Sequence, residues 1–154
     1  VGARPGPYLE ALKQEVRLHD LESQVFFVPE TRDIFDFYRL ADVFVCTSFE
    51  ESFPRVLLES AVFGLPIVST NVNGIAEMLA ADEAWLHAPG DRYLLAEALK
   101  QALAAHFAGD GRRAERARAA ILARYHGEIS LPLHLALARA VAVEKLARVG
   151  LDAR

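Results

Sequence analysis

Two glutamates, Glu51 and Glu59, are the residues of this sequence whose types and spacing best suit chemistry. They bound one continuous segment, Glu51-Ser52-Phe53-Pro54-Arg55-Val56-Leu57-Leu58-Glu59. Glu51 lies in a loop after an apolar run, and Glu59 lies about a turn and a half into the helix that is predicted to follow. Because helical side chains lean towards the helix N-terminus, Glu59 is expected to point back to the loop. Both carboxylates would then face one crevice.

A carboxylate within an apolar run needs hydrogen-bond donors, and Glu59 stands in the stretch 56–63, which is apolar apart from Glu59 and Ser60. The two hydroxyls of a ribose would supply such donors. The helix start near Pro54 offers unpaired N–H groups and a positive dipole end, which suit a phosphate oxygen. Glu51 is placed to accept hydrogen bonds from a sugar further out. Ribose, phosphate and sugar would lie in a line.

A purely structural interpretation of the same pair stays open. Glu59 would pair with a core arginine or reach solvent, and Glu51 would be one of several surface acids that favour the helix dipole. Two glutamates at this spacing are common in proteins, so the spacing alone does not decide between the two interpretations.

The elements that must position these glutamates alternate between apolar runs and helices. Strands are predicted at residues 25–28, 43–47, 67–70 and 84–87. Helices are predicted around residues 9–16, 34–40, 54–63, 75–79 and from 91 to about 107, with further Ala- and Arg-rich helices beyond. Thr31, Pro54 and Asp91 suit helix starts. Apolar strands that each precede a helix imply a parallel sheet with helices on both faces. The predicted fold class is α/β and Rossmann-like, with a helical C-terminal tail.

In such sheets, ligands bind beyond the carboxyl ends of the strands. Three loops follow predicted strands, and they are Pro29 to Arg32, Ser48 to Phe53 and Asn71 to Gly74. A ligand site is therefore expected where these loops meet.

Composition excludes several classes of protein. The chain has 154 residues, a net charge of −4 and a single cysteine, Cys46, inside an apolar run. An acidic chain lacks the basic surface that nucleic acids require. One cysteine cannot form a disulfide within the chain, and we interpret it as a buried core residue. The five histidines have no metal-ligand spacing, and no apolar stretch has the length of a membrane span, so we predict a soluble protein without a metal or cofactor.

An ordered series of motifs resembles the family 4 (group 1) retaining glycosyltransferases, which have the GT-B fold. The series consists of Ala41-Asp42-Val43-Phe44-Val45, Glu50-Glu51-Ser52-Phe53, Leu57-Leu58-Glu59-Ser60-Ala61, Gly64-Leu65-Pro66-Ile67-Val68-Ser69-Thr70 and Asn73-Gly74-Ile75-Ala76-Glu77. The likeness covers about residues 5 to 107 in order. It implies the C-terminal, donor-binding domain of such an enzyme.

The resemblance also implies roles for individual residues. Glu59 would bind the ribose hydroxyls of a nucleoside-diphosphate sugar such as a UDP sugar, and Glu51 would contact the donor sugar as the catalytic residue. Backbone amides of Ser52, Phe53, Pro54 and Arg55 would hold phosphate and sugar. Thr31 would lie against the base, and Asn73 and Gly74 would lie near the crevice. Pro54 departs from the glycine that is usual there, and it removes one backbone N–H.

The family's basic pair and its N-terminal acceptor-binding domain have no counterpart in these residues. We therefore expect residues 1–107 to form a truncated nucleotide-sugar-binding domain, and residues 108–154 to form helices that pack on it or on a missing domain. The expected partners are a nucleoside-diphosphate sugar and that acceptor domain, or an equivalent partner chain. Alone, the chain would bind its donor and turn over nothing.

Other interpretations use the same residues. A non-catalytic nucleotide-binding or scaffolding domain could keep the fold and lose the transferase role. An epimerase or phosphorylase of the same fold fits less well, because epimerases lack this glutamate pair. A cytoplasmic location is expected. Five arginines could touch an anionic membrane surface, or they could form a solvated helix face, and they are Arg112, Arg113, Arg116, Arg118 and Arg124.

Overall fold

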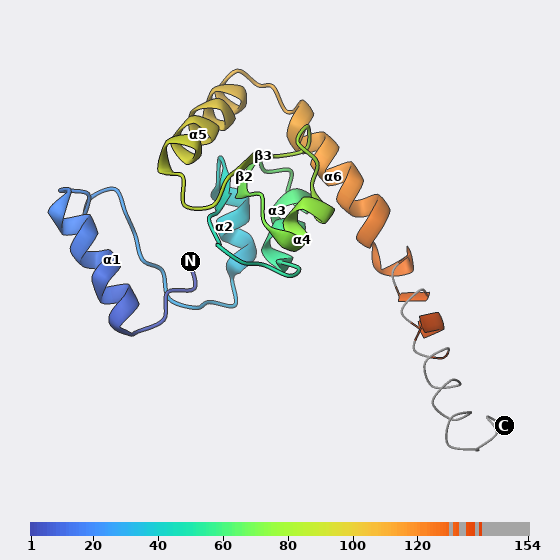
Figure 1. Cartoon of the computed structure of the whole chain (residues 1–154), viewed down its shortest axis with the longest axis horizontal. Helices are drawn as coiled ribbons and strands as arrows, with labels where there is room; N and C mark the ends of the chain where they lie inside the picture. Colours follow the sequence, from blue (N-terminus) through green and yellow to red (C-terminus); the bar gives the residue numbers. More distant parts are fainter. Residues whose placement is uncertain (130, 133–134, 138, 140–154) are drawn as a thin grey trace, which may run out of the picture. The chain divides into compact units, whose positions relative to one another are not determined.

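A computed structural model describes residues 1–129, 131–132, 135–137 and 139 of the chain. The chain folds as two compact units, residues 1–40 and residues 41–154 (Figure 1). The predicted packing of the last part of residues 108–154 lies largely outside the described residues. The predicted domain boundary at residue 107 stays a prediction.

The first unit holds two helices, α1 (Pro7–Leu18) and α2 (Ile34–Leu40). Both were expected from their apolar spacing, and Pro7 occupies the first turn of α1, where its missing N–H costs nothing. The predicted capping of α2 by Thr31 is wrong. The Thr31 hydroxyl accepts a hydrogen bond from the Asp33 N–H, so it closes a turn before the helix begins at Ile34.

The predicted strand at residues 25–28 is also wrong. Only a single parallel bridge, between Ala3 and Pro29, and a hydrogen bond from the Ala3 N–H to the Val28 carbonyl are formed there. A ladder cannot continue, because Pro5 follows Ala3 closely and Pro29 has no N–H. Phe26 is accordingly 74% exposed, although an apolar run would suggest a buried residue.

The second unit is built on a three-stranded parallel sheet in the order β1 (Phe44–Cys46), β2 (Ile67–Thr70) and β3 (Trp85–His87). Each strand falls inside a predicted one. Phe44 pairs with Ile67, and Val68 pairs with Trp85. Parallel pairing brings the carboxyl ends of all three strands to one edge, as the site prediction requires.

Helices cover both faces of this sheet, as predicted (Figure 1). One face carries α3 (Arg55–Val62), α4 (Asn73–Met78) and α6 (Arg112–Tyr125), and the other carries α5 (Arg92–Phe107). Successive residues of β2 alternate between the two cores, since Ile67 packs towards α3 and Val68 packs towards α5. Both are fully buried, which explains why the strand reads as a continuous apolar run.

The helix ends follow the expected chemistry in two places. The Asp91 carboxylate accepts hydrogen bonds from the N–H groups of Tyr93 and Leu94 at the start of α5. Gly64, with φ +75°, follows α3 and turns the chain towards β2. Beside α6, hydrogen bonds from Arg112 lower the pKa of Asp110 to about 2. Asp91 thus ends the turn between β3 and α5, and Gly64 begins the turn between α3 and β2.

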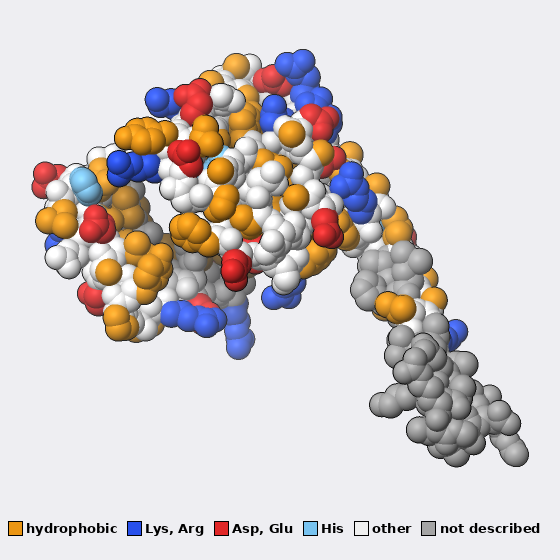
Figure 2. Space-filling view, in the orientation of Figure 1, with side chains coloured by type: hydrophobic (Ala, Val, Ile, Leu, Met, Phe, Trp, Pro, Cys, Tyr) orange, Lys and Arg blue, Asp and Glu red, His pale blue; other side chains and the backbone are white. Residues whose placement is uncertain are grey.

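Four of the arginines on α6 bind the protein's own backbone. Their guanidinium groups donate hydrogen bonds of 2.6 to 3.3 Å to the carbonyls of Ala81 and Ala84 (Arg113), Asp82 (Arg116), Val62 (Arg118) and Met78 (Arg124). Figure 2 shows basic and acidic side chains mixed over the start of α6. These arginines therefore fasten α6 to the ends of neighbouring elements, and membrane contact through them stays a prediction. None of the described helices is long and apolar enough to span a bilayer.

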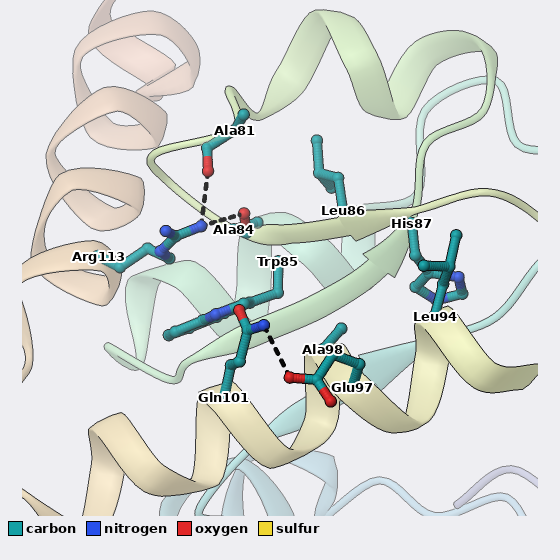
Figure 3. Close-up of a pocket in the computed structure, with 10 residues that line it drawn as sticks. All are labelled: Ala81, Ala84, Trp85, Leu86, His87, Leu94, Glu97, Ala98, Gln101 and Arg113. Carbon is teal, nitrogen blue, oxygen red and sulfur yellow. Dashed lines mark hydrogen bonds between the residues drawn. The ribbon is translucent and has the colours of Figure 1, made fainter.

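A groove of about 260 Å³ lies between β3 and α5 (Figure 3). Trp85 forms one wall, and the Arg113 guanidinium lies 4.5 Å from the centroid of its ring. His87 also lines the groove, but the residue is only 6% exposed, and its Nε2 atom has no hydrogen-bond partner among the described residues. Its Nδ1 lies 2.9 Å from the Ala88 carbonyl oxygen, which fits Nδ1–H as the donor and leaves Nε2 as a buried, unsatisfied acceptor.

Replacing His87 with leucine is expected to stabilise the chain. A buried acceptor without a partner costs about 1–3 kcal/mol, and leucine fills similar space without that cost. Ala88 is an exposed residue, so its carbonyl would bind water instead. Urea unfolding should show a free energy of unfolding about 1 kcal/mol higher in His87→Leu than in the wild type. An unchanged or lower value would mean that the Nε2 atom is satisfied in solution.

Candidate functional site

The loops that follow β1 and β2 are joined by hydrogen bonds at the carboxyl edge of the sheet. The Thr70 hydroxyl donates to the Ser48 carbonyl at 2.7 Å, and the Gly74 N–H donates to the Glu51 carbonyl at 3.3 Å. A Cβ atom on Gly74 would stand 1.7 Å from the Ser52 carbonyl oxygen, a distance that no side chain tolerates. Glycine at position 74 therefore allows the two loops to touch, and this contact sets the path of the loop that carries Glu51.

The Glu51 side chain is held by its own loop. The Ser48 hydroxyl donates a 2.9 Å hydrogen bond to the Glu51 Oε1 atom, and Ser48 in turn lies 3.6 Å from the buried Cys46 thiol. Glu51 is half-buried, so one side of its carboxylate is fixed by the protein while the residue keeps contact with solvent. A carboxylate in that state is able to accept hydrogen bonds from hydroxyl groups of a ligand.

Glu59 occupies the second turn of α3. Its neighbours Leu57 and Ser60 are fully buried, and the Ser60 hydroxyl donates to the Leu57 carbonyl. Glu59 itself is half-buried, which differs from the burial that its apolar surroundings suggested. The helix turns Leu57 and Ala61 into the core and leaves Glu59 at the boundary, where a carboxylate is less costly and a ligand is able to reach it.

The start of α3 has the character of an anion site. Pro54 is buried and directly precedes the helix, which begins at Arg55, one residue later than predicted. No side chain of the described residues caps the helix, and its first turn holds no acidic residue. The N–H groups at Arg55 and Val56 therefore meet no side-chain acceptor at the cap, and the positive end of the helix dipole is not neutralised there.

The remaining residues predicted for the site differ in how they lie. Ser52 and Arg55 are exposed. Phe53 turns away from the loop and packs edge-to-face on Tyr125 of α6, with ring centroids 5.2 Å apart. A ligand role for Phe53 is thus left to its backbone. Asn73 is exposed at the start of α4, with φ +34°.

Thr31 belongs to the unit of residues 1–40, and its contact with a base stays a prediction. Among the described residues, no group of three or more histidine, cysteine or acidic side chains is arranged to hold a metal ion.

Sequence reasoning missed two residues of this edge. Ser48 positions the Glu51 carboxylate, and Thr70 holds the Ser48 carbonyl. The spacing of Ser48 three residues before Glu51 is a weak signal of a side-chain hydrogen bond within a turn. No signal in the sequence pairs Thr70 with Ser48, because that contact depends on the register of β1 with β2.

A family model described as "Glycosyl transferases group 1" matches residues 1–105 of the chain. Among curated proteins, the chain is 35% identical over 81 residues to the lipopolysaccharide core biosynthesis mannosyltransferase LpsB of Rhizobium meliloti. That match covers 51% of this chain and 23% of the relative. The chain thus spans about a quarter of that relative's length.

Two solved structures are similar over most of the chain. Sucrose-phosphate synthase from Thermosynechococcus elongatus aligns with a TM-score of 0.81 and 25% identity, covering 92% of this chain and 37% of that one. Anabaena HepE in complex with UDP-glucose aligns with a TM-score of 0.73 and 25% identity, covering 82% and 36%. The fold class predicted from the sequence, the Rossmann-like domain of the GT-B fold, is confirmed.

Proposed function

The chain belongs to the glycosyl transferases of group 1, and we propose that it is the domain of such an enzyme that binds the sugar donor, a nucleoside-diphosphate sugar. The observation that carries the proposal is the geometry of the segment Glu51 to Glu59. One stretch of chain presents a half-buried carboxylate held by Ser48, a helix start without a side-chain cap and a second half-buried carboxylate. HepE, a structural relative, was solved with UDP-glucose.

These three features match the three parts of the donor. Glu59 accepts hydrogen bonds from the ribose hydroxyls, because a carboxylate binds two vicinal hydroxyls well. The start of α3, near Pro54 and Arg55, receives a phosphate oxygen at its N–H groups. Glu51 accepts hydrogen bonds from the transferred sugar. Asn73 and Gly74 lie beside this segment and complete the proposed pocket. A contact of Thr31, in the unit of residues 1–40, with the base stays a prediction.

The proposed reaction proceeds with retention of configuration. An acceptor hydroxyl attacks the anomeric carbon from the face that the diphosphate leaves, the bond from that carbon to the phosphate oxygen breaks, and the acceptor's proton passes to the diphosphate. The dipole of α3 stabilises part of the leaving-group charge. The acceptor site and the basic residues that complete the charge balance belong, in this proposal, to another domain or chain. The 154-residue chain is accordingly expected to bind a donor and to transfer nothing.

Titration calorimetry with UDP, GDP and ADP and with their sugar derivatives tests the proposal. We expect saturable binding of one nucleotide and of its sugar derivative, and no consumption of the donor when simple sugars are added. Absence of binding by every nucleotide would favour the scaffolding role instead. Turnover by the chain alone would contradict the assignment of the acceptor site to another domain.

A further inference from the structure

We propose that Phe49 is a specificity-determining residue, whose exposed ring stacks against the pyranose ring of the donor sugar. This inference rests on the proposed function and adds the contact that distinguishes a sugar nucleotide from the nucleotide alone. Three observations support it. Phe49 lies at the carboxyl edge of the sheet, its ring is exposed, and the ring packs against the backbone of Gly90.

Phe49 lies in the same short loop as Ser48 and Glu51, directly after β1. This loop runs along the carboxyl edge of the whole sheet. Its backbone is tied to the end of β2 through Thr70 and to the start of α4 through Gly74, while the Phe49 ring reaches the turn after β3. Phe49 and Glu51 are two residues apart, so their Cα atoms lie within about 7 Å of each other. A sugar that hydrogen-bonds to Glu51 is therefore within reach of the Phe49 ring.

Gly90 gives the Phe49 ring a defined position. A Cβ atom on Gly90 would stand 3.3 Å from Cε1 of Phe49, which is tighter than an ordinary contact. Gly90 also has φ +77°, a conformation that other residues adopt only with strain. Because position 90 has no side chain, the Phe49 ring packs directly against the backbone of the turn after β3.

The opposite side of Phe49 is open, since 72% of the residue is exposed. Burying an aromatic residue is favourable, so a ligand that covers the exposed Phe49 ring at this edge gains free energy of binding from that contact. Binding pockets combine aromatic walls with a few polar groups that fix orientation. A pyranose suits this pair, because its C–H groups pack on the negative face of a ring while its hydroxyls donate to Glu51.

The decisive measurement is the ratio of two affinities. Titrations of the 154-residue chain with UDP and UDP-glucose, or with GDP and GDP-mannose if the guanine nucleotide binds, give the gain in affinity that the sugar provides. In Phe49→Ala we expect this gain to fall about five- to tenfold, the effect of one aromatic stacking contact. Affinity for the bare diphosphate should stay within about twofold. Phe49→Tyr keeps the ring and is expected to retain the gain.

Phe107→Ala provides a matched control. Phe107 is 76% exposed, but it ends α5 and lies about 22 Å along the helix from its first residue, Arg92, at about 1.5 Å per residue. This variant should leave both affinities unchanged.

The inference fails on its own if the wild type gains affinity from the sugar and Phe49→Ala keeps that gain. It also fails if the wild type binds the diphosphate and its sugar derivative equally well. If no nucleotide binds the wild type, the proposed function fails, and the stacking role fails with it.

Discussion

Glu59→Gln is expected to lower the affinity of the chain for a nucleoside diphosphate by about tenfold to a hundredfold. Hydrogen bonds to a charged group contribute about 1.5–3 kcal/mol, and glutamine keeps the shape of the side chain while removing its charge. The glutamine amide also replaces one acceptor oxygen with an NH₂ group, so it accepts fewer hydrogen bonds from the two ribose hydroxyls. Isothermal titration of wild type and variant with the nucleotide that binds provides the measurement.

Glu97→Gln is the matched control for this substitution. Glu97 is also a helical glutamate, but it lies on α5, where its carboxylate accepts a 3.1 Å hydrogen bond from Gln101. The control should bind the nucleotide as the wild type does. Equal affinities in Glu59→Gln and the wild type would remove Glu59 from the binding site, and with it the main support for a ribose contact.

Stability has to be measured in parallel, because Glu59 is half-buried and lies next to fully buried residues of α3. Urea unfolding of Glu59→Gln should give a free energy within about 1 kcal/mol of the wild type, since the change keeps size and polarity. A loss of binding with an unchanged unfolding free energy then reports on the ligand contact. A loss of both would point to the structural interpretation of Glu59 that the spacing of the two glutamates left open.

The fold was predictable from sequence wherever strands are buried on both faces. β1, β2 and β3 lie within three of the four predicted apolar runs. Both faces of β2 meet a core, whereas β1 packs through Phe44 and Cys46 and leaves Val45 exposed. The run 25–28 is also apolar but lacks such partners, and a single bridge, between Ala3 and Pro29, forms just after it. Local composition indicates whether a segment is able to form a strand. Whether the strand forms depends on a second segment that pairs with it.

The residues of the candidate site were proposed from the sequence, whereas the contacts between them were not. The glutamate pair and the start of α3 follow from types and spacing within one segment. Two contacts join the loop after β1 to other strands. The Thr70 hydroxyl at the end of β2 donates to the Ser48 carbonyl, and Gly90 after β3 packs against the Phe49 ring. Such contacts depend on the register of the sheet, which the sequence does not state residue by residue.

Gly74→Ala is expected to be the most damaging single-methyl substitution at this edge. The added Cβ would stand 1.7 Å from the Ser52 carbonyl oxygen and 2.7 Å from its carbonyl carbon, so backbone has to move. That movement breaks the hydrogen bond from the Gly74 N–H to the Glu51 carbonyl and displaces the loop that leads into α3. Overpacking of this kind costs about 1–3 kcal/mol, and we expect nucleotide binding to be lost with it.

Two further glycines separate the possible causes of such a loss. A Cβ on Gly127 meets no described atom within 4 Å and its φ is not positive, so Gly127→Ala should change neither stability nor binding. A Cβ on Gly64 also meets open space in the described part of the chain, but its φ of +75° imposes strain, so Gly64→Ala should cost about 1 kcal/mol and spare binding. Urea unfolding and nucleotide titration of all three variants give the comparison. If Gly74→Ala behaves like Gly64→Ala, the loops are not in contact in solution, and Glu51 is not held by the turn that follows β2.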